Sequence, residues 1–420
     1  MNPLSPKQSA QIATHVYTVK DAVMSSKGGV EDEAARLGLS NSFDFSNLQM
    51  ASGTSGAVFR TRTGFAYAVH GVGGRQGEML LAFRGTDTFA DAMTDANAGL
   101  QRGPSTWPVH AGFNETFKSL RNDLDSFMRG RNPSTVHCVG HSLGGALATL
   151  AADHLSELGV AGIKLYTFGS PRTGVGGFAR HLSGKLGASN IHRVYHSADP
   201  VSMVPIFPFS HVPVTGNVCM IPWKGAQISA NAHRMTQYLP SIGDATWTGL
   251  YRNPEPPLDR DIDLWLESAS YGPTLYSATT LWMISRAMQY LLKKAANIVI
   301  GSAITVSMTV LDQIAGVLVQ GAQLCKDISD SIRALIVKIF NFLGRAVPTT
   351  IDVTTFFLRC TRPALQSGSR PGASGHATGG AFLTTKNGAF RRRFHITDPL
   401  PRPSARCWHP AHRPHRPSRC

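Results

Sequence analysis

Residues 135–150 read TVHCVGHSLGGALATL, and this stretch decides the fold. Its first part, Thr135–Val139, is short and largely apolar, which is typical of a buried strand. From Ala146 onward, small and apolar residues with high helix propensity predict a helix. The chain is therefore expected to pass from a strand to a helix through the tight segment GHSLG, residues 140–144.

Ser142 lies at the centre of this strand-to-helix turn. Such a turn projects the serine hydroxyl outward, and Gly140 and Gly144 leave room where side chains would meet neighbouring backbone. Free N–H groups at the start of the following helix favour a developing negative charge beside the serine. The Gly-x-Ser-x-Gly pattern alone is weak. Its flanking strand and helix make Ser142 the candidate nucleophile, within an elbow formed by Gly140, His141 and Gly144.

Strands and helices alternate along the first 250 residues. Short apolar runs predict strands at 78–83, 135–139, 163–168 and 191–195. Helical patterns occur at 113–128, 146–158 and 178–186. This alternation predicts an α/β fold of the α/β-hydrolase type, with a mainly parallel central sheet covered by helices.

The N-terminal part adds a helix and a pair of strands to this expectation. Ser5 is placed to cap a helix whose apolar residues recur at helical spacing. Strands are predicted at 57–60 and 66–69, around a turn at 62–64.

A serine hydroxyl needs a base, usually a histidine that a carboxylate orients. In this fold the acid follows the serine and the histidine comes last. Asp199 directly follows a predicted strand, where catalytic groups of parallel sheets collect; a turn-capping aspartate is the alternative. Only His211 and His233 lie between Asp199 and the end of the enzyme-like region. We favour His233, because its polar surroundings are typical of a loop, whereas His211 begins a candidate strand.

The oxyanion of an acyl-transfer reaction needs two backbone N–H donors. One comes from the residue after the nucleophile, which is Leu143. The other is expected from the loop after an earlier central strand. Thr86 is the candidate, since the segment 84–86 follows the buried run that ends at Phe83.

These elements together resemble the class 3 lipases, a family of fungal-type triacylglycerol lipases. The resemblance covers roughly residues 10–250. It rests on LAFRGT at 81–86, VHAGF at 109–113, VGHSLGGALA at 139–148, TFGSPR at 167–172, DPV at 199–201 with Val204-Pro205, and His233 with Tyr238.

The resemblance implies a site and a covering segment. Ser142, Asp199 and His233 correspond to the family's catalytic triad, and Thr86 and Leu143 to its oxyanion hole. His211 corresponds to a non-catalytic histidine. The segment after Thr86 corresponds to the family's lid, and Phe89, Met93 and Leu100 would form its apolar side. An ordinary surface helix is the alternative for this segment.

Three regions are expected along the chain. Residues 1–257 form the lipase-like domain, and a Pro-rich breaker at 253–257 ends it. Residues 258–345 look helical and apolar, either as a cap on the enzyme or as an interfacial, membrane-engaging pair of helices. By architecture this region is similar to bacterial class 3 lipases that are delivered as antibacterial phospholipases. Residues 346–420 form a linker and a basic tail expected to be disordered.

Charge and cysteines limit the other classes of function. The tail from residue 360 onward holds eleven of the 41 Lys and Arg residues and one acid, so the net charge of +15 is mostly a property of the tail. We therefore expect no nucleic acid as partner of the folded part. The six cysteines lack metal-ligand spacing. No charged segment followed by an apolar one is seen at the N-terminus, which predicts a cytoplasmic location or export by a non-classical route.

The expected activity is hydrolysis of carboxylic esters in acylglycerols or phospholipids through an acyl-enzyme. No metal or organic cofactor is expected. The partners are a lipid ester and a lipid–water interface or membrane surface, and a delivery or inhibitor protein stays open. The alternatives are a phospholipase A-type antibacterial toxin and an inactive binding protein on a hydrolase scaffold.

Overall fold

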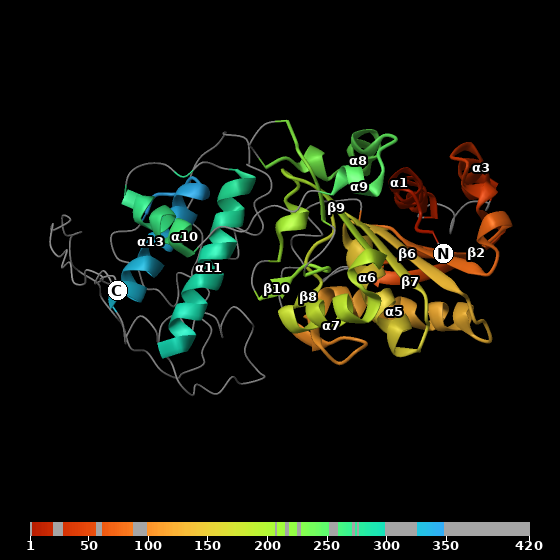
Figure 1. Ribbon diagram of the computed structural model, residues 1–420, viewed down its shortest axis with the longest axis horizontal. Helices are drawn as coiled ribbons and strands as arrows, with labels where there is room; N and C mark the ends of the chain where they lie inside the picture. The colour runs from red at the N-terminus through yellow and green to blue at the C-terminus, as the bar shows by residue number, and fades with distance from the viewer. Residues whose placement is uncertain are drawn as a thin grey trace, which may run out of the picture.

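The computed structural model contains an α/β domain and a group of C-terminal helices (Figure 1). Elements carry the labels of Figure 1. The described residues are 2–19, 28–55, 61–86, 99–205, 208–214, 218–224, 228–251, 259–270, 274, 277–298 and 326–347.

A seven-stranded sheet with the order β1-β2-β3-β6-β7-β9-β11 forms the centre of the α/β domain. The first two strands pair antiparallel with their neighbours, and the strands from β3 to β11 run parallel. The mainly parallel sheet agrees with the prediction. Its strands are β1 (Phe43–Ser55), β2 (Thr61–Gly71), β3 (Glu78–Phe83), β6 (Thr135–His141), β7 (Ile163–Phe168), β9 (Ile191–His196) and β11 (Val218–Ile221).

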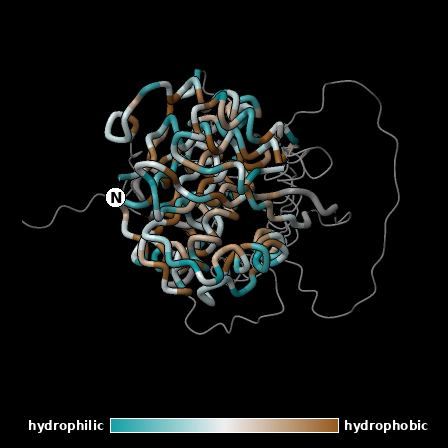
Figure 2. The backbone as a smooth tube through the Cα atoms, turned by 90° about the vertical axis from the view of Figure 1, so that its right-hand side faces the viewer, coloured by the Kyte–Doolittle hydropathy of each residue, from teal (hydrophilic) through white to brown (hydrophobic). Residues whose placement is uncertain are grey.

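The sheet is buried on both faces, which explains why its central strands read as unbroken apolar runs. In β3, Met79 and Leu81 pack into the core on one face, whereas Leu80 and Ala82 pack into the core on the other. This division follows the two-residue period of a strand. In Figure 2 hydrophobic segments run through the middle of the domain, and many outer turns are hydrophilic.

Helices cover both faces of the sheet. On one face, α5 (Ala111–Met128) buries Phe113, Phe117, Leu120 and Leu124, spaced three and four residues apart. Its companions are α6 (Leu143–Glu157) and α7 (Gly176–Leu186). The opposite face holds α1 (Pro6–His15), which the Ser5 hydroxyl caps, together with η1 (Val16–Thr18), α3 (Gly28–Arg36), α8 (Met235–Ile242) and α9 (Trp247–Leu250).

Short 3-10 helices connect several of these elements. They are η2 (Leu39–Asn41), η3 (Gly73–Arg75), η4 (Ala188–Asn190), η5 (Val201–Met203) and η6 (Ala230–His233). Two of them lie beyond the carboxyl ends of the strands: η5 begins two residues after Asp199, and η6 contains His233.

A second, four-stranded sheet with the order β10-β8-β5-β4 corrects one expectation about the lid. Leu100, assigned to the apolar side of a lid helix, lies instead in β4, where it pairs with His110. Phe89 and Met93 lie outside the described residues. The strands are β4 (Leu100–Arg102), β5 (Pro108–His110), β8 (Gly174–Val175) and β10 (Phe209–Ser210).

The predicted turn at 62–64 is also wrong. These residues continue β2, and Arg62, Thr63 and Gly64 pair with residues 52–54 of β1. Backbone hydrogen bonding to a strand that the sequence pattern had not indicated outweighs the local turn preference of Gly64. The strand predicted at 57–60 lies outside the described residues.

The C-terminal helices pack on one another. They are α10 (Asp259–Glu267), η7 (Ser268–Ser270), α11 (Ala278–Ile298) and α13 (Lys326–Phe342). In α13, Ile332, Leu335, Ile336 and Ile339 are buried at helical spacing. The helix α11 also contacts η5, directly after Asp199. Among the described residues, no helix has the length and hydrophobicity needed to cross a membrane.

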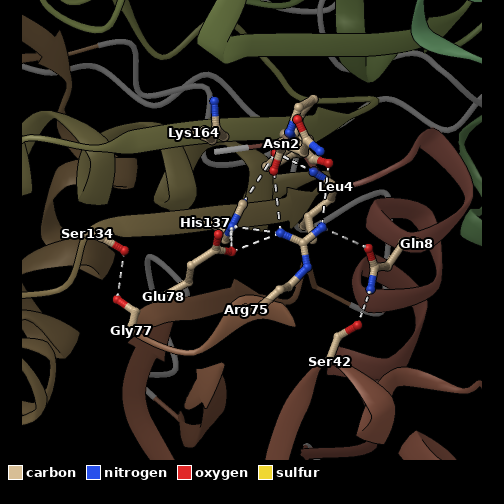
Figure 3. A network of polar contacts seen from close by, with 12 residues as sticks. Asn2, Leu4, Gln8, Ser42, Arg75, Gly77, Glu78, Ser134, His137 and Lys164 are labelled. Atoms are coloured by element: carbon tan, nitrogen blue, oxygen red, sulfur yellow. Dashed lines mark hydrogen bonds and ion pairs between the residues drawn. The ribbon is translucent and has the colours of Figure 1, made fainter. Parts of the chain in front are cut away.

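A buried polar network lies at the amino ends of the central strands (Figure 3). His137 Nε2 and Arg75 Nη1 each lie 2.8 Å from Glu78 Oε2. Arg75 also donates to the carbonyl oxygens of Asn2 and Pro3, which holds the N-terminal segment against the sheet. The buried charge of Glu78 is thus compensated by hydrogen bonds from two sides.

Candidate active site

The elbow around Ser142 is tightly packed. Ser142 follows β6 and precedes α6 with φ of 57°, a backbone conformation that costs energy for a residue with a side chain. A Cβ added at Gly140 would lie 2.0 Å from the Gly144 carbonyl oxygen, and one added at Gly144 would lie 2.1 Å from that of Phe83. Only glycine fits at either position, so the two glycines allow the strained turn that brings the Ser142 hydroxyl to His233.

Ser142, His233 and Asp199 form a continuous chain of hydrogen bonds. His233 Nε2 lies 2.8 Å from Ser142 Oγ. On the other side of the ring, His233 Nδ1 lies 2.9 Å from Asp199 Oδ2 and 3.0 Å from Oδ1. All three residues are buried, and Asp199 is fully so. A carboxylate on Nδ1 fixes the tautomer whose Nε2 accepts a proton from the serine hydroxyl.

Further hydrogen bonds hold Asp199 as an anion. Tyr238 donates its hydroxyl to Asp199 Oδ2 at 2.6 Å, and the Val201 N–H donates to Oδ1 at 2.9 Å. Burial alone would raise the pKa of the Asp199 carboxyl. The charge and hydrogen bond of His233, together with the Tyr238 hydroxyl, outweigh burial and hold that pKa below its ordinary value. The carboxyl therefore stays ionised at neutral pH.

Two histidines hold the backbone around His233 in place through hydrogen bonds to its carbonyl oxygens. His196 Nδ1 donates to the Ala232 carbonyl oxygen at 2.7 Å. His141 Nε2 donates to the His233 carbonyl oxygen at 2.7 Å, and the two rings stack with centroids 4.7 Å apart. Since both bonds hold backbone carbonyl oxygens, they fix the position of the His233 Cα from which the side chain extends.

The segment 84–86 packs directly against the elbow. A Cβ added at Gly85 would lie 2.8 Å from Ser142 Cβ. Arg84 holds this segment through its backbone N–H to Phe65 and its side chain to the Gly85 carbonyl oxygen. Thr86 follows at the carboxyl end of β3, and Leu143 begins α6 beside Ser142. Of the two predicted oxyanion residues, Leu143 is thus next to Ser142 in the chain, and Thr86 directly follows Gly85, which packs against Ser142.

The other predicted histidine lies elsewhere. His211 Nε2 is 2.7 Å from the Ser202 carbonyl oxygen and 2.9 Å from Arg193 Nη2. The structure therefore brings His233, and not His211, to Ser142 and Asp199. Among the described residues, no group of three or more His, Cys, Asp or Glu side chains is arranged to hold a metal ion.

Two contributors were absent from the sequence-based site. Tyr17 contacts both His141 and Gly85, and His196 contacts the loop of His233. Neither belongs to a recognisable motif. His196 had one usable signal, since it ends the strand that leads to Asp199.

Comparison with known proteins gives a family match over the central part of the chain. Residues 80–209 match the model of the family described as lipase (class 3). This range contains Thr86, Ser142, Leu143 and Asp199. His233 lies beyond it, so its place beside Ser142 comes from the fold.

Two of the similar proteins come from fungi. A secreted mono- and diacylglycerol lipase A of Penicillium cyclopium is 29% identical over 247 residues, which are 57% of this chain and 74% of the relative. A secreted mono- and diacylglycerol lipase 1 of Fusarium solani is 34% identical over 164 residues, 37% of this chain and 48% of the relative. Among solved structures, lipase II from Rhizopus niveus aligns with 22% identity, 58% of this chain, 91% of that chain and a TM-score of 0.41.

These comparisons correct the expected location. The Penicillium and Fusarium relatives are named as secreted enzymes, which points to export. The prediction of a cytoplasmic location or a non-classical route is therefore wrong. It relied on the composition of the first residues, which is a weak indicator compared with related whole proteins.

Proposed function

Because this chain belongs to the class 3 lipase family and is a serine ester hydrolase that acts on acylglycerols, we propose that Ser142, His233 and Asp199 are its catalytic triad. The observation that carries this proposal is the unbroken hydrogen-bond chain from Ser142 Oγ through both nitrogens of His233 to the Asp199 carboxylate. The strained elbow at Ser142 supports it, since strain of this kind concentrates at functional sites.

Acylation begins when His233 Nε2 takes the proton of the Ser142 hydroxyl. Ser142 Oγ attacks the acyl carbonyl carbon, and the carbonyl oxygen becomes an oxyanion. The resulting His233 imidazolium is stabilised by the Asp199 carboxylate, which remains ionised. His233 then donates the proton to the departing alcohol oxygen, and the ester C–O bond breaks to leave an acyl-enzyme.

Deacylation repeats these steps with water as the nucleophile. His233 takes a proton from water, the hydroxide attacks the acyl-enzyme carbonyl, and Ser142 leaves as its hydroxyl after receiving the proton. The backbone N–H groups of Thr86 and Leu143 hold the oxyanion in both half-reactions. Removing one such donor typically costs about 10²–10³ in rate.

The substrates proposed here are mono- and diacylglycerols at a lipid–water interface, by analogy with the named activity of the Penicillium and Fusarium relatives. A head-to-head assay tests this with emulsified diacylglycerol, emulsified triacylglycerol and phosphatidylcholine vesicles, with the Ser142→Ala variant as the blank. Faster release of fatty acid from diacylglycerol supports the proposal. Faster release from vesicles would replace it with a phospholipase. Activity that survives in Ser142→Ala at the parental rate would refute the triad itself.

We also propose that residues 1–257 form the catalytic domain and that 258–345 form a helical cap, with the tail at 346–420 dispensable for chemistry. The contact of α11 with η5, next to Asp199, supports a cap that touches the site's edge. Truncation after residue 257 tests this. Retained hydrolysis of a soluble short-chain ester, with altered activity on emulsions, is the expected result; equal loss of both would make the helices part of the catalytic fold.

A further inference from the structure

Tyr17 reaches the candidate active site from the N-terminal end of the chain. It lies in η1, directly after α1, and its hydroxyl is 2.7 Å from His141 Nδ1. The same hydroxyl oxygen accepts the Gly85 N–H at 3.2 Å. One side chain thus contacts both the nucleophile elbow and the segment that leads to Thr86.

The directions of these hydrogen bonds, and of the bond from His141 to the His233 backbone, follow from their chemistry. The His233 carbonyl oxygen can only accept, so His141 Nε2 carries a hydrogen and donates to it. Since neutral imidazole has one N–H, His141 Nδ1 is the acceptor, and the Tyr17 hydroxyl must donate to it. The Tyr17 oxygen then accepts from Gly85. The donors in these three hydrogen bonds run in one direction, from Gly85 to Tyr17 to His141 to His233.

His141 is held in the neutral form that this arrangement requires. It is buried, and burial together with the nearby His233 lowers the pKa of its imidazole to about 3. A neutral His141 keeps the hydrogen-bond directions fixed over the pH range in which a triad works. It also places no positive charge against the imidazolium that forms on His233.

Gly85 lies in a confined place between Tyr17 and Ser142. A Cβ there would be 2.7 Å from the Tyr17 hydroxyl oxygen and 2.8 Å from Ser142 Cβ. The backbone that precedes Thr86 is therefore in contact with the nucleophile on one side and is hydrogen-bonded to Tyr17 on the other. Movement of Gly85 would displace the Thr86 amide from the position of the oxyanion.

We infer that Tyr17 and His141 are positioning residues that tie the oxyanion side of the site to the backbone of the catalytic base. The inference rests on the proposed function, because it needs His233 as base and Thr86 as an oxyanion donor. Both residues act through the backbone of Gly85 and His233 and take no part in bond making or breaking. Their effect is to keep the Thr86 amide and the His233 ring at a fixed separation across Ser142, although the two residues are about 150 positions apart in the sequence. Catalysis is sensitive to such placement, since a shift of about 1 Å costs up to about 10² in rate.

The protein contains a matched control for this hydrogen-bond pattern. Tyr67 lies on β2 and its hydroxyl is 3.1 Å from His15 Nδ1, while His15 Nε2 is 2.8 Å from the Val30 carbonyl oxygen. This is the same tyrosine–histidine–carbonyl chain, and it is buried, but its two hydrogen bonds end at Val30 and not at a candidate site residue. Tyr67→Phe therefore removes an equivalent hydroxyl with a structural role alone.

The experiment compares Tyr17→Phe, Tyr67→Phe, Ser142→Ala and the parent full-length chain on a soluble p-nitrophenyl ester. We expect both tyrosine variants to lower Tm. Only Tyr17→Phe is expected to lower kcat, by about tenfold to a hundredfold with KM within twofold, and to slow phosphonate inactivation by a similar factor. Equal kcat in the two tyrosine variants would overturn the inference while Ser142→Ala remains inactive. Full activity of Ser142→Ala would instead overturn the proposed function.

A second pair of variants keeps the inference testable if Tyr17→Phe does not fold. Glutamine at 141 offers an oxygen acceptor toward Tyr17 and an N–H donor toward the His233 carbonyl, whereas leucine offers neither. His141→Gln is expected to have at least tenfold higher kcat than His141→Leu at similar KM. Equal kcat values for these two variants would contradict a positioning role.

Discussion

Two histidine–carboxylate pairs lie at opposite ends of the same sheet, and only one of them is hydrogen-bonded to a serine hydroxyl. His233 and Asp199, at the carboxyl edge, are 2.9 Å apart; His137 and Glu78, at the amino edge, are 2.8 Å apart. In both pairs hydrogen bonds outweigh burial and lower the pKa of the carboxyl. The pair itself therefore does not define an active site.

The difference lies in what occupies the second nitrogen of each histidine. His233 Nε2 faces Ser142 Oγ at 2.8 Å, whereas His137 Nδ1 faces the Tyr166 hydroxyl at 3.3 Å. Glu78 is further neutralised by Arg75, which leaves no free charge to stabilise an imidazolium. The His233 pair fits the proposed proton transfer, whereas the His137 pair belongs to the network that holds the N-terminal segment (Figure 3).

The largest expected difference between the pairs concerns their carboxylates. Asp199→Asn should lower kcat on a soluble ester by about 10⁴, because the amide favours the wrong tautomer of His233. Glu78→Gln should leave kcat within about threefold and lower only the stability. The measurement is steady-state kinetics of both variants beside thermal unfolding. Comparable kcat losses would remove the functional distinction between the two ends of the sheet.

The next largest effect concerns the glycines near each pair. Gly144→Ala should lower kcat by at least about 10², because its Cβ would lie 2.1 Å from the Phe83 carbonyl oxygen and force the elbow apart. Gly74→Ala, beside Arg75, has no atom within 4 Å of its Cβ and should be neutral. Activity and circular dichroism of the two variants test this. An active Gly144→Ala would mean that the elbow tolerates a side chain.

A smaller effect is expected from the hydroxyl that supports Asp199. Tyr238→Phe removes the 2.6 Å hydrogen bond to Asp199 Oδ2 while the ring stays stacked on His196. The carboxylate keeps its bonds from His233 and Val201, so we expect kcat to fall only about threefold to tenfold. Kinetics at constant pH measure this. A loss as large as that of Asp199→Asn would indicate that Tyr238 holds the whole loop in place.

The smallest effect on activity, but a clear one on stability, is expected at His137. Burial lowers the pKa of its imidazole from 6.5 to about 4. Between these values the unfolded chain binds one more proton, so stability falls as pH drops from 6.5 toward 4. His137→Gln should reduce the slope of unfolding free energy against pH by about 1.4 kcal/mol per pH unit and leave kcat nearly unchanged. Denaturant unfolding at several pH values measures the slope; an unchanged slope would contradict a neutral buried His137.

The sequence predicts best the parts of the site that local patterns encode. The strand, elbow and helix around Ser142 follow from contiguous residues, and Asp199 follows from its place after a strand. Chain order limited the base to His211 or His233, and a loop-like context favoured His233. In the structure it is His233 that lies beside both Ser142 and Asp199.

The sequence predicts poorly what depends on contacts between distant segments. Tyr17 lies 124 residues from its partner His141, and nothing in its neighbours marks it. The strand pairing of 62–64 with β1 was missed for the same reason, because the partner strand lacks a clear apolar alternation. Such features come from packing, which a local pattern cannot specify.

Active-site labelling identifies the nucleophile without relying on kinetics. The full-length protein is treated with a p-nitrophenyl alkylphosphonate, and the adduct is located by peptide mass spectrometry. We expect a single adduct on Ser142, formed much more slowly in Asp199→Asn and at the parental rate in Glu78→Gln. An adduct on another residue, or no adduct on a folded protein that still hydrolyses esters, would contradict the assignment of Ser142 as the nucleophile.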